Sequence, residues 1–302
     1  METQTVLTQV KRCLDNIDRF DQEVNAFITV LSDTALEEAQ QADDDYAGGG
    51  GAGLLAGVPI SVKDCIDVAG VRCTNGSLFF KDYVPERDAL IVQRLRKAGA
   101  VIVGKTNLHE FAYGSTTQNP HYGPTRNPWD LTRIPSGSSG GAGASLAADM
   151  CVGAVGSDTG GSVRTPAAIN GVTGLRPTMG SIPMTGSFTR ICPAIDTVGP
   201  LGKSVDIVAR MFTAMAGYDD DDIYSVRHSW SDAFQEMSSG IAGLRIGLPR
   251  HFFFDDLEPG IGDAVEEAAT QMGQLGAVIS EIELEGADSA QQDVMPMVWA
   301  DA

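Results

Sequence analysis

Helical and strand-like segments alternate along most of this chain, and this order restricts the fold more than any other feature of the sequence. From Gly57 onward, the β-rich run GVPISVKD is followed by a predicted helix over 88–99 and by the apolar strand VIVGK over 101–105. The alternation continues with predicted helices and strands at 145–150, 151–158, 161–170, 204–217, 244–249, 260–276 and 277–286. Such an order predicts an α/β sandwich with a mostly parallel or mixed sheet.

Two helices are expected before this pattern begins. The first, over 3–19, places four apolar residues on one helical face: Val6, Val10, Leu14 and Ile17. The second begins near Thr34, because Thr34 and Glu37 have the spacing of a capping box. The run ADDDYAGGGGAG over 42–53 then predicts a flexible, exposed loop.

We expect one domain over residues 1–302, with three parts. Peripheral N-terminal helices take up 1–45, the core takes up 57–202, and a partial C-terminal part takes up 203–302. The last residues, DVMPMVWADA, resemble the start of an apolar element that has no cap or polar tail. We therefore expect the chain to be C-terminally truncated.

The charge balance is strongly acidic, with 40 acids against 21 bases and a formal net charge of −19. Because the chain has no excess of basic residues, direct binding of nucleic acid is not expected. Excess carboxylate repels itself and is screened by salt, which suggests a halophilic protein in a salt-rich cytoplasm; an ordinary acidic enzyme is the alternative. No apolar run has the length of a membrane span, and the N-terminus lacks the features of a signal peptide, so we expect a cytoplasmic protein.

The cysteines and histidines indicate neither a metal site nor a disulfide framework. The five cysteines form no C-x-x-C pair and have no histidine at metal-ligand spacing, which predicts buried free thiols. His109 lies near aromatic residues and is predicted to be structural, whereas His121 lies in a turn-rich loop. We therefore expect no metal and no cofactor.

Two short stretches match the sequence motifs of known sites but lack the flanking secondary structure that those sites require. GAGLLAG at 51–57 matches a dinucleotide-binding turn, yet an acidic loop precedes it and a strand follows it. GSSGG at 137–141 matches a nucleophile elbow centred on Ser139, yet a loop stands where the elbow requires a strand. Neither motif is retained as a site.

The stretch GSDTGGSVRTP, residues 156–166, follows a predicted strand and is predicted to open a helix at Ser162. Its glycines allow a sharp turn, and a helix N-terminus presents unpaired N–H groups. Backbone N–H groups of Thr159, Gly160, Gly161 and Ser162 could thus form an oxyanion hole, with Ser162 as the nucleophile. A phosphate-binding loop or a helix cap is the alternative, although the stretch has no Lys-Ser/Thr ending of a Walker motif.

From about Gly57 to Gly202 the sequence resembles the amidase signature enzymes. The resemblance is carried by PSGSSGGAGASLAADMCVGAVGSDTGGSVRTPAAINGVTGLRPT, with GVPISVKD, GKTNLHEFA, an NP pair and DTVGPL in the family's order. It implies an α/β/α sandwich whose mixed central sheet is flanked by helices. One departure is Ser136, which stands where the family usually has glycine.

The same resemblance implies a Ser–Ser–Lys triad of Lys63, Ser138 and Ser162, in which the peptide bond before Ser138 is cis. Lys63, kept neutral by burial, would take the proton of Ser162 through Ser138, and an acyl-enzyme would form on a small carboxamide substrate. The expected reaction releases ammonia and a carboxylate. Asp158 and Arg164 are expected to hold the loop by hydrogen bonds and an ion pair.

Within this family the sequence leaves three alternatives open. The first is a stand-alone amidase, with a homodimer as one option for its assembly. The second is the A-subunit of the glutamyl-tRNA(Gln)/aspartyl-tRNA(Asn) amidotransferase, which is a glutaminase with partner subunits. Against it, Thr165 stands where that protein typically has Gln, and TGSFTRICPAIDT differs from its usual YGLVAFASSLDQ. The third is a truncated, inactive relative.

Overall fold

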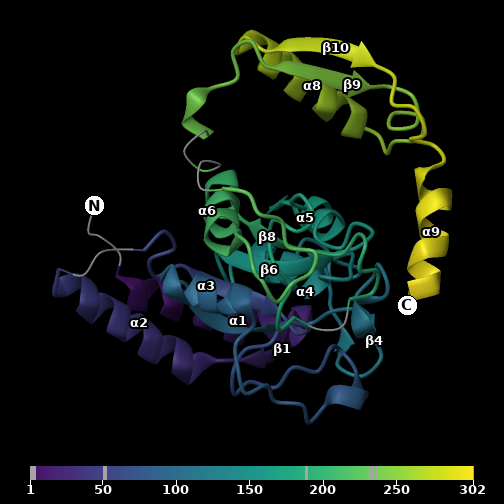
Figure 1. Cartoon of the computed structure of the whole chain (residues 1–302). Coiled ribbons are helices and arrows are strands. Elements are labelled where there is room, and N and C mark those ends of the chain that lie inside the picture. The colour runs from purple at the N-terminus through teal and green to yellow at the C-terminus, as the bar shows by residue number, and fades with distance from the viewer. Residues whose placement is uncertain (1–4, 50–52, 188–189, 231–233, 235–236, 302) are drawn as a thin grey trace. The chain divides into compact units, whose positions relative to one another are not determined.

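A six-stranded mixed sheet forms the centre of the larger part of the chain (Figure 1). The computed structural model describes residues 5–49, 53–187, 190–230, 234 and 237–301. In spatial order the strands are β1 (Phe27–Val30), β3 (Val101–Thr106), β2 (Pro59–Lys63), β6 (Gly153–Asp158), β8 (Thr197–Gly202) and β7 (Thr173–Gly174). Strand β2 runs parallel to both β3 and β6, and the outer pairings are antiparallel. The predicted mixed α/β sheet is confirmed.

Helices cover both faces of this sheet. The hydrophobic cluster on one face draws buried residues from α1 (Val6–Val24), α2 (Ser32–Ala47), α4 (Gly140–Ala147) and α5 (Arg164–Asn170). On the other face, α6 (Val205–Met215) packs against β8 and against α3 (Leu90–Lys97). Shorter elements are the β4–β5 hairpin (Gln118–Asn119 and Gly123–Pro124) and the 3-10 turns η1 (Leu78–Phe80) and η2 (Glu110–Ala112).

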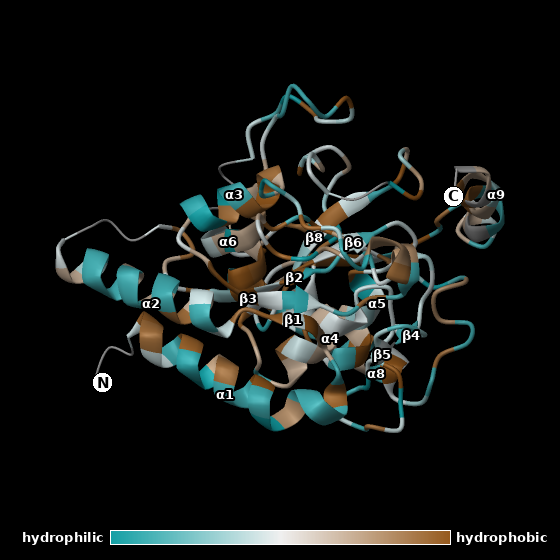
Figure 2. Ribbon diagram, turned by 90° about the horizontal axis from the view of Figure 1, so that it is seen from below, coloured by the Kyte–Doolittle hydropathy of each residue, from teal (hydrophilic) through white to brown (hydrophobic). Residues whose placement is uncertain are grey.

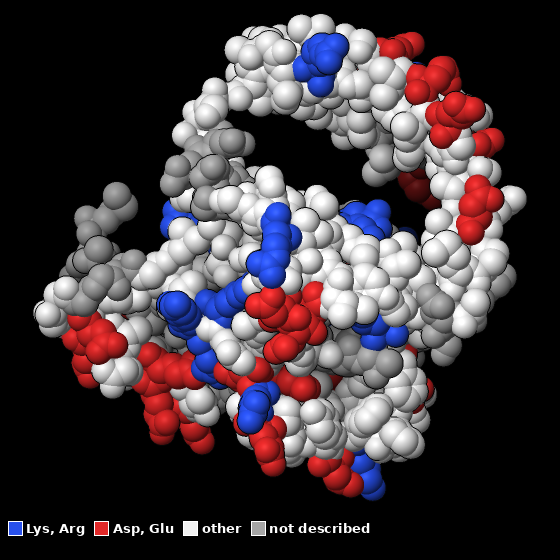
Figure 3. Space-filling model, in the orientation of Figure 1, with Lys and Arg blue, Asp and Glu red and all other residues white. Residues whose placement is uncertain are grey.

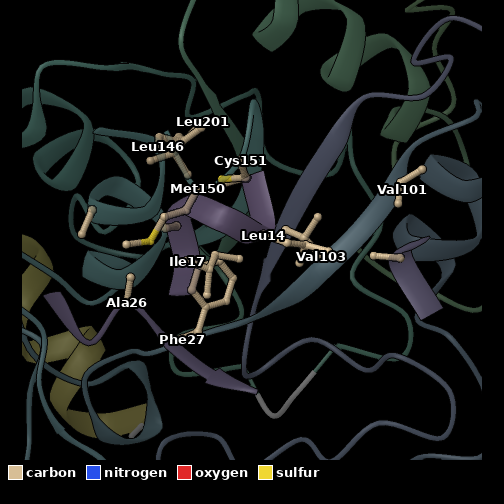
Figure 4. Packing of buried hydrophobic residues seen from close by; sticks show 14 of the residues in the cluster. Leu14, Ile17, Ala26, Phe27, Val101, Val103, Leu146, Met150, Cys151 and Leu201 are labelled. Carbon is tan, nitrogen blue, oxygen red and sulfur yellow. The ribbon is translucent and has the colours of Figure 1, made fainter. Parts of the chain in front are cut away.

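The N-terminal segment packs into this core more closely than the predicted peripheral layer of helices would. The predicted apolar face of α1 is confirmed, because all four of its residues are buried. Figure 4 shows Leu14 and Ile17 of α1 in one cluster with Phe27 of β1 and Val103 of β3, and in Figure 2 the ribbon of α1 alternates between hydrophobic and hydrophilic residues. Strand β1, which the sequence pattern did not predict, joins the edge of the sheet beside β3.

The start predicted for the second helix, and the start of the loop predicted after it, both differ from the structure. Helix α2 begins at Ser32 instead of Thr34, because the Leu31 N–H donates to the Val103 carbonyl and the chain turns into the helix directly after strand pairing ends. The helix also continues to Ala47, through the acidic run assigned to a loop. Residues 50–52 of that predicted loop lie outside the described residues. Acidic side chains crowd the surface over α2 (Figure 3).

Residues 235–302 form a second compact unit, where a single domain was expected over the whole chain. It holds η3 (Met237–Ser239), the parallel pair β9 (Arg245–Pro249) and β10 (Val278–Ile282), α8 (Ile261–Gln274) and α9 (Ala290–Asp301). The predicted strand–helix–strand order is confirmed here. Across the described residues, no helix is long and apolar enough to span a bilayer. All five cysteines are buried, and none of them forms a disulfide.

Candidate active site

Two neighbouring parallel strands, both in the middle of the sheet, bring the candidate residues together at their carboxyl ends, which we call the carboxyl edge of the sheet. Lys63 is the last residue of β2, and Asp158 is the last residue of β6. Val62 and Val155 are paired in register, so the carboxyl ends of the two strands lie together. Ligands of open α/β sheets bind at such carboxyl ends. The loops that follow β6 and precede α4 carry the two candidate serines.

Lys63 is enclosed at this edge and bound to two hydroxyl groups. Its Nζ donates to Ser138 Oγ at 2.7 Å and to Ser157 Oγ at 2.9 Å, and both Lys63 and Ser138 are fully buried. The contact implied between Lys63 and Ser138 is therefore present. Ser157 is a partner that sequence reasoning missed, although its place at the end of a predicted strand marked it as near the edge.

Burial changes the acidity of this lysine. It lowers the pKa of Lys63 to about 8 from 10.5, and the nearby Cys65, Asp158 and Asp196 only partly oppose the shift. A group with that pKa is neutral in about one molecule in ten at pH 7, whereas an ordinary lysine is neutral in fewer than one in a thousand. The site thus has a base available near neutral pH.

Hydrogen bonds to neighbouring segments anchor the Ser138 loop. The Ser138 carbonyl accepts from the His109 N–H at 3.1 Å, and the peptide bond between Gly137 and Ser138 is cis, as the resemblance implied. Ser139, the centre of the rejected elbow motif, is fully buried and donates its hydroxyl to the Ser157 carbonyl at 3.2 Å. Ser139 therefore fastens the loop to β6. A nucleophile, in contrast, would face a substrate.

His109 and His121, the two histidines considered in the sequence, lie in the loops beside the site. His109 Nδ1 is 3.3 Å from Thr116 Oγ1, and burial lowers the pKa of His109. His121 Nε2 lies 2.9 Å from the Glu110 carboxylate. Within the described residues, no group of three or more His, Cys, Asp and Glu side chains could hold a metal ion.

Asp158 organises the loop that carries Ser162. Its carboxylate accepts from the backbone N–H groups of Gly161 and Val163 and from the guanidinium groups of Arg164 and Arg176. Burial alone would raise the pKa of Asp158, but the hydrogen bonds from Arg164, Val163 and Gly161 outweigh it and lower the pKa to about 2. The expected role of Asp158 and Arg164 in holding the loop is confirmed.

Replacing Asp158 by asparagine is expected to lower the free energy of unfolding by about 2 kcal/mol at pH 7, the value of a pKa depressed from 3.8 to about 2. Because the folded pKa lies below the ordinary one, this contribution is present above pH 4 and is lost as the pH falls toward 2. Urea unfolding at pH 7 measures it. Asp206→Asn, which breaks a more exposed pair with Arg210, is the control and should change stability by less than about 0.5 kcal/mol. Equal losses in the two variants would contradict the organising role.

The loop differs from the prediction in two ways. Helix α5 begins at Arg164 instead of Ser162, because the Asp158 carboxylate holds the N–H groups of residues 161 and 163 in a turn. The Gly161 N–H is thereby directed to Asp158 at 2.9 Å and is not a free oxyanion donor, which corrects that assignment. Thr159, Gly160 and Ser162 remain as proposed donors.

Ser162 itself is half-buried, in contrast to Lys63 and Ser138. In the part of the chain that the structure describes, Ser162 Oγ makes no hydrogen bond to Ser138 or Lys63. The structure thus joins two of the three predicted catalytic residues directly. It places the third in the loop that leaves the adjacent strand.

An α/β sheet with a buried lysine–serine pair at its carboxyl edge is the arrangement that the amidase signature resemblance implies. The chain belongs to the Amidase family, which it matches over residues 8–302. Among curated relatives, it is 42% identical over 274 residues to the A-subunit of the glutamyl-tRNA(Gln) amidotransferase of Carboxydothermus hydrogenoformans, covering 91% of this chain and 56% of the relative. The chain therefore spans a little over half the length of such relatives.

Solved structures of several amidase-type proteins are similar to this one. The A-subunit of the glutamyl-tRNA(Gln) amidotransferase from Thermotoga maritima is 33% identical, with a TM-score of 0.85 over 98% of this chain and 62% of that one. The native peptide amidase from Stenotrophomonas maltophilia is 34% identical, with a TM-score of 0.84 over 94% and 60%. A chain from a vestigial complex linked to the origins of an s-triazine catabolic enzyme is 37% identical, with a TM-score of 0.92 over 98% and 64%.

Proposed function

We propose that the protein containing this chain is a cytoplasmic amidase that converts a carboxamide to a carboxylate and ammonia, with Ser162 as the nucleophile. The observation that carries the proposal is the 2.7 Å hydrogen bond from the fully buried Lys63 to Ser138. A buried lysine with a lowered pKa and a hydroxyl partner is suited to act as a general base. The family assignment and the loop position of Ser162 support the same chemistry.

The proposed reaction has two halves. Ser138 passes its proton to neutral Lys63 and takes the proton of Ser162, whose Oγ attacks the amide carbonyl carbon. Negative charge on the carbonyl oxygen is met by N–H groups of Thr159, Gly160 and Ser162. The relay then returns the proton to the amide nitrogen, the C–N bond breaks and ammonia leaves. Water, deprotonated through the same relay, cleaves the acyl-enzyme and restores Ser162.

Ammonia release from a panel of primary amides, including glutamine, tests the proposal. Because the protonated base is inactive, kcat/KM is expected to rise about tenfold per pH unit below pH 8 and to level off above it. The same assays at low and high salt also test the proposed adaptation to salt. Salt screens the repulsion between carboxylates, so high salt should favour the activity of so acidic a chain. A pH-independent rate between pH 6 and 9 would contradict Lys63 as the base. Absence of ammonia from every amide would contradict the function.

A glutaminase component of an amidotransferase is the second candidate, and a specific observation favours it. Eight curated relatives, at 41–43% identity, are all glutamyl-tRNA(Gln) amidotransferase A-subunits. Co-purification of two partner proteins, with glutamine as the preferred substrate, would favour this candidate. A homodimer or monomer that hydrolyses other amides without partners would favour the stand-alone amidase.

A further inference from the structure

The hydroxyl group of Thr165 lies between the two serine-bearing loops. Thr165 Oγ1 is 3.2 Å from the Gly137 carbonyl oxygen and 3.0 Å from the Gly161 carbonyl oxygen. Each carbonyl belongs to the peptide group directly before a candidate catalytic serine, Ser138 in one loop and Ser162 in the other. One side chain outside the proposed triad therefore contacts both peptide groups that carry the serines.

Thr165 also controls the direction of one peptide plane. The Gly161 carbonyl accepts from the Thr165 N–H at 2.8 Å as well as from its hydroxyl. The peptide bond between Gly161 and Ser162 is trans, and in a planar trans peptide the C=O and N–H groups point in opposite directions. Holding the Gly161 carbonyl toward Thr165 consequently holds the Ser162 N–H away from it.

The methyl group of Thr165 restricts which residue can stand at position 161. Gly161 has φ +122°, a conformation that residues with a side chain rarely adopt, and a Cβ added there would lie 3.2 Å from Thr165 Cγ2. The Thr165 methyl group thus occupies space that a side chain at position 161 would need, while the hydroxyl and the N–H of the same residue hold the Gly161 carbonyl.

We propose that Thr165 is a positioning residue that sets the orientation of the Ser162 N–H and keeps the Ser138 and Ser162 loops in register. Its hydroxyl contacts two backbone carbonyls and, among the described residues, makes no hydrogen bond to a side chain of the proposed triad. Its single hydroxyl proton, shared between the two carbonyl oxygens, holds the oxyanion donor in the direction required in the transition state, so loss of the hydroxyl lowers kcat more than it raises KM. The inference rests on the proposed function only in taking Ser162 as the nucleophile.

Thr165→Val and Thr165→Ser separate the two contacts, because valine keeps the methyl group and serine keeps the hydroxyl. Steady-state kinetics on an amide that the wild-type protein hydrolyses should show kcat lowered about tenfold in Thr165→Val with KM within about twofold, and kcat restored to within about threefold in Thr165→Ser. Thr213→Val is the matched control, because Thr213 Oγ1 donates at 2.9 Å to the carbonyl four residues earlier, in α6, away from the site. Its kcat should equal that of the wild type.

Two results would overturn the inference. One is wild-type kcat in Thr165→Val; the other is a defect in Thr165→Ser as large as that in Thr165→Val. If the wild-type chain releases no ammonia, the proposed function fails instead, and amide hydrogen exchange at Gly161, whose N–H donates to Asp158 in the same turn, still tests Thr165. Exchange at Gly161 should then be at least about fivefold faster in Thr165→Val and unchanged in Thr213→Val, and equal exchange in all three proteins would overturn the positioning role.

Discussion

Ser162→Ala is expected to abolish amide hydrolysis, with kcat lowered by at least about 10⁴-fold and no acyl-enzyme formed. The loop that carries Ser162 is held by the Asp158 carboxylate through residues 161 and 163, not through the Ser162 side chain, so folding should be unaffected. Ammonia release and mass spectrometry of the protein after a short reaction with an ester or amide substrate measure the two effects.

Ser139→Ala is the control for this variant, since Ser139 is the serine of the rejected elbow motif. It loses a buried hydrogen bond to the Ser157 carbonyl and should be less stable, yet it should still form the acyl-enzyme. The assignment would fail if Ser162→Ala kept wild-type turnover, or if the acyl group were found on Ser139.

Lys63→Met is expected to reduce kcat/KM by at least about 10³-fold at pH 7 and to remove the rise in rate through pH 8. Methionine has a similar length but cannot accept a proton from Ser138. The pH–rate profile is the decisive measurement, because a merely structural lysine would leave its shape unchanged. An unchanged rise through pH 8 in Lys63→Met would place the base elsewhere.

Stability distinguishes loss of the base from loss of the fold. A lysine whose pKa falls from 10.5 to about 8 on folding costs about 3 kcal/mol while it is protonated in both states, that is, below pH 8, and this cost disappears as the pH rises above 10.5. Lys63→Met removes that cost at pH 7. The variant also loses the hydrogen bonds to Ser138 and Ser157, so the two effects offset and its free energy of unfolding should stay close to that of the wild type. A large loss would show that destabilisation, and not loss of the base, explains the inactivity.

The resemblance named Lys63 and Ser138 correctly as neighbours, because it rests on motifs that share an order and spacing along the chain. It could not name Ser157, which lies 94 residues from Lys63 and meets it only because β2 and β6 are adjacent. Nor could it show that the Gly161 N–H is directed to Asp158. Several donors compete for a carboxylate in a glycine-rich turn, and the outcome depends on the fold of the turn.

The local sequence pattern was sufficient to predict most helices and strands of the core. It failed where tertiary contacts decide at which residue an element begins or ends. The periodicity of α1 predicted its buried face, since one helical face must pack on the sheet. The capping pattern at Thr34 failed, because the pairing of the preceding segment with β3 starts α2 at Ser32. Strand β1 has only four residues and little alternation, so its place at the sheet edge came from pairing alone.

By itself the sequence determined the class of fold, the glycine-rich turn after a strand, and the lysine and serines available for chemistry. These depend on periodicity and residue type, which are local properties. Only the tertiary structure decided that Lys63 is sealed from water between Ser138 and Ser157, and that Thr165 joins the two serine-bearing loops. Such contacts arise from strand order and register, which bring distant segments together, and burial between those segments lowers the pKa of Lys63.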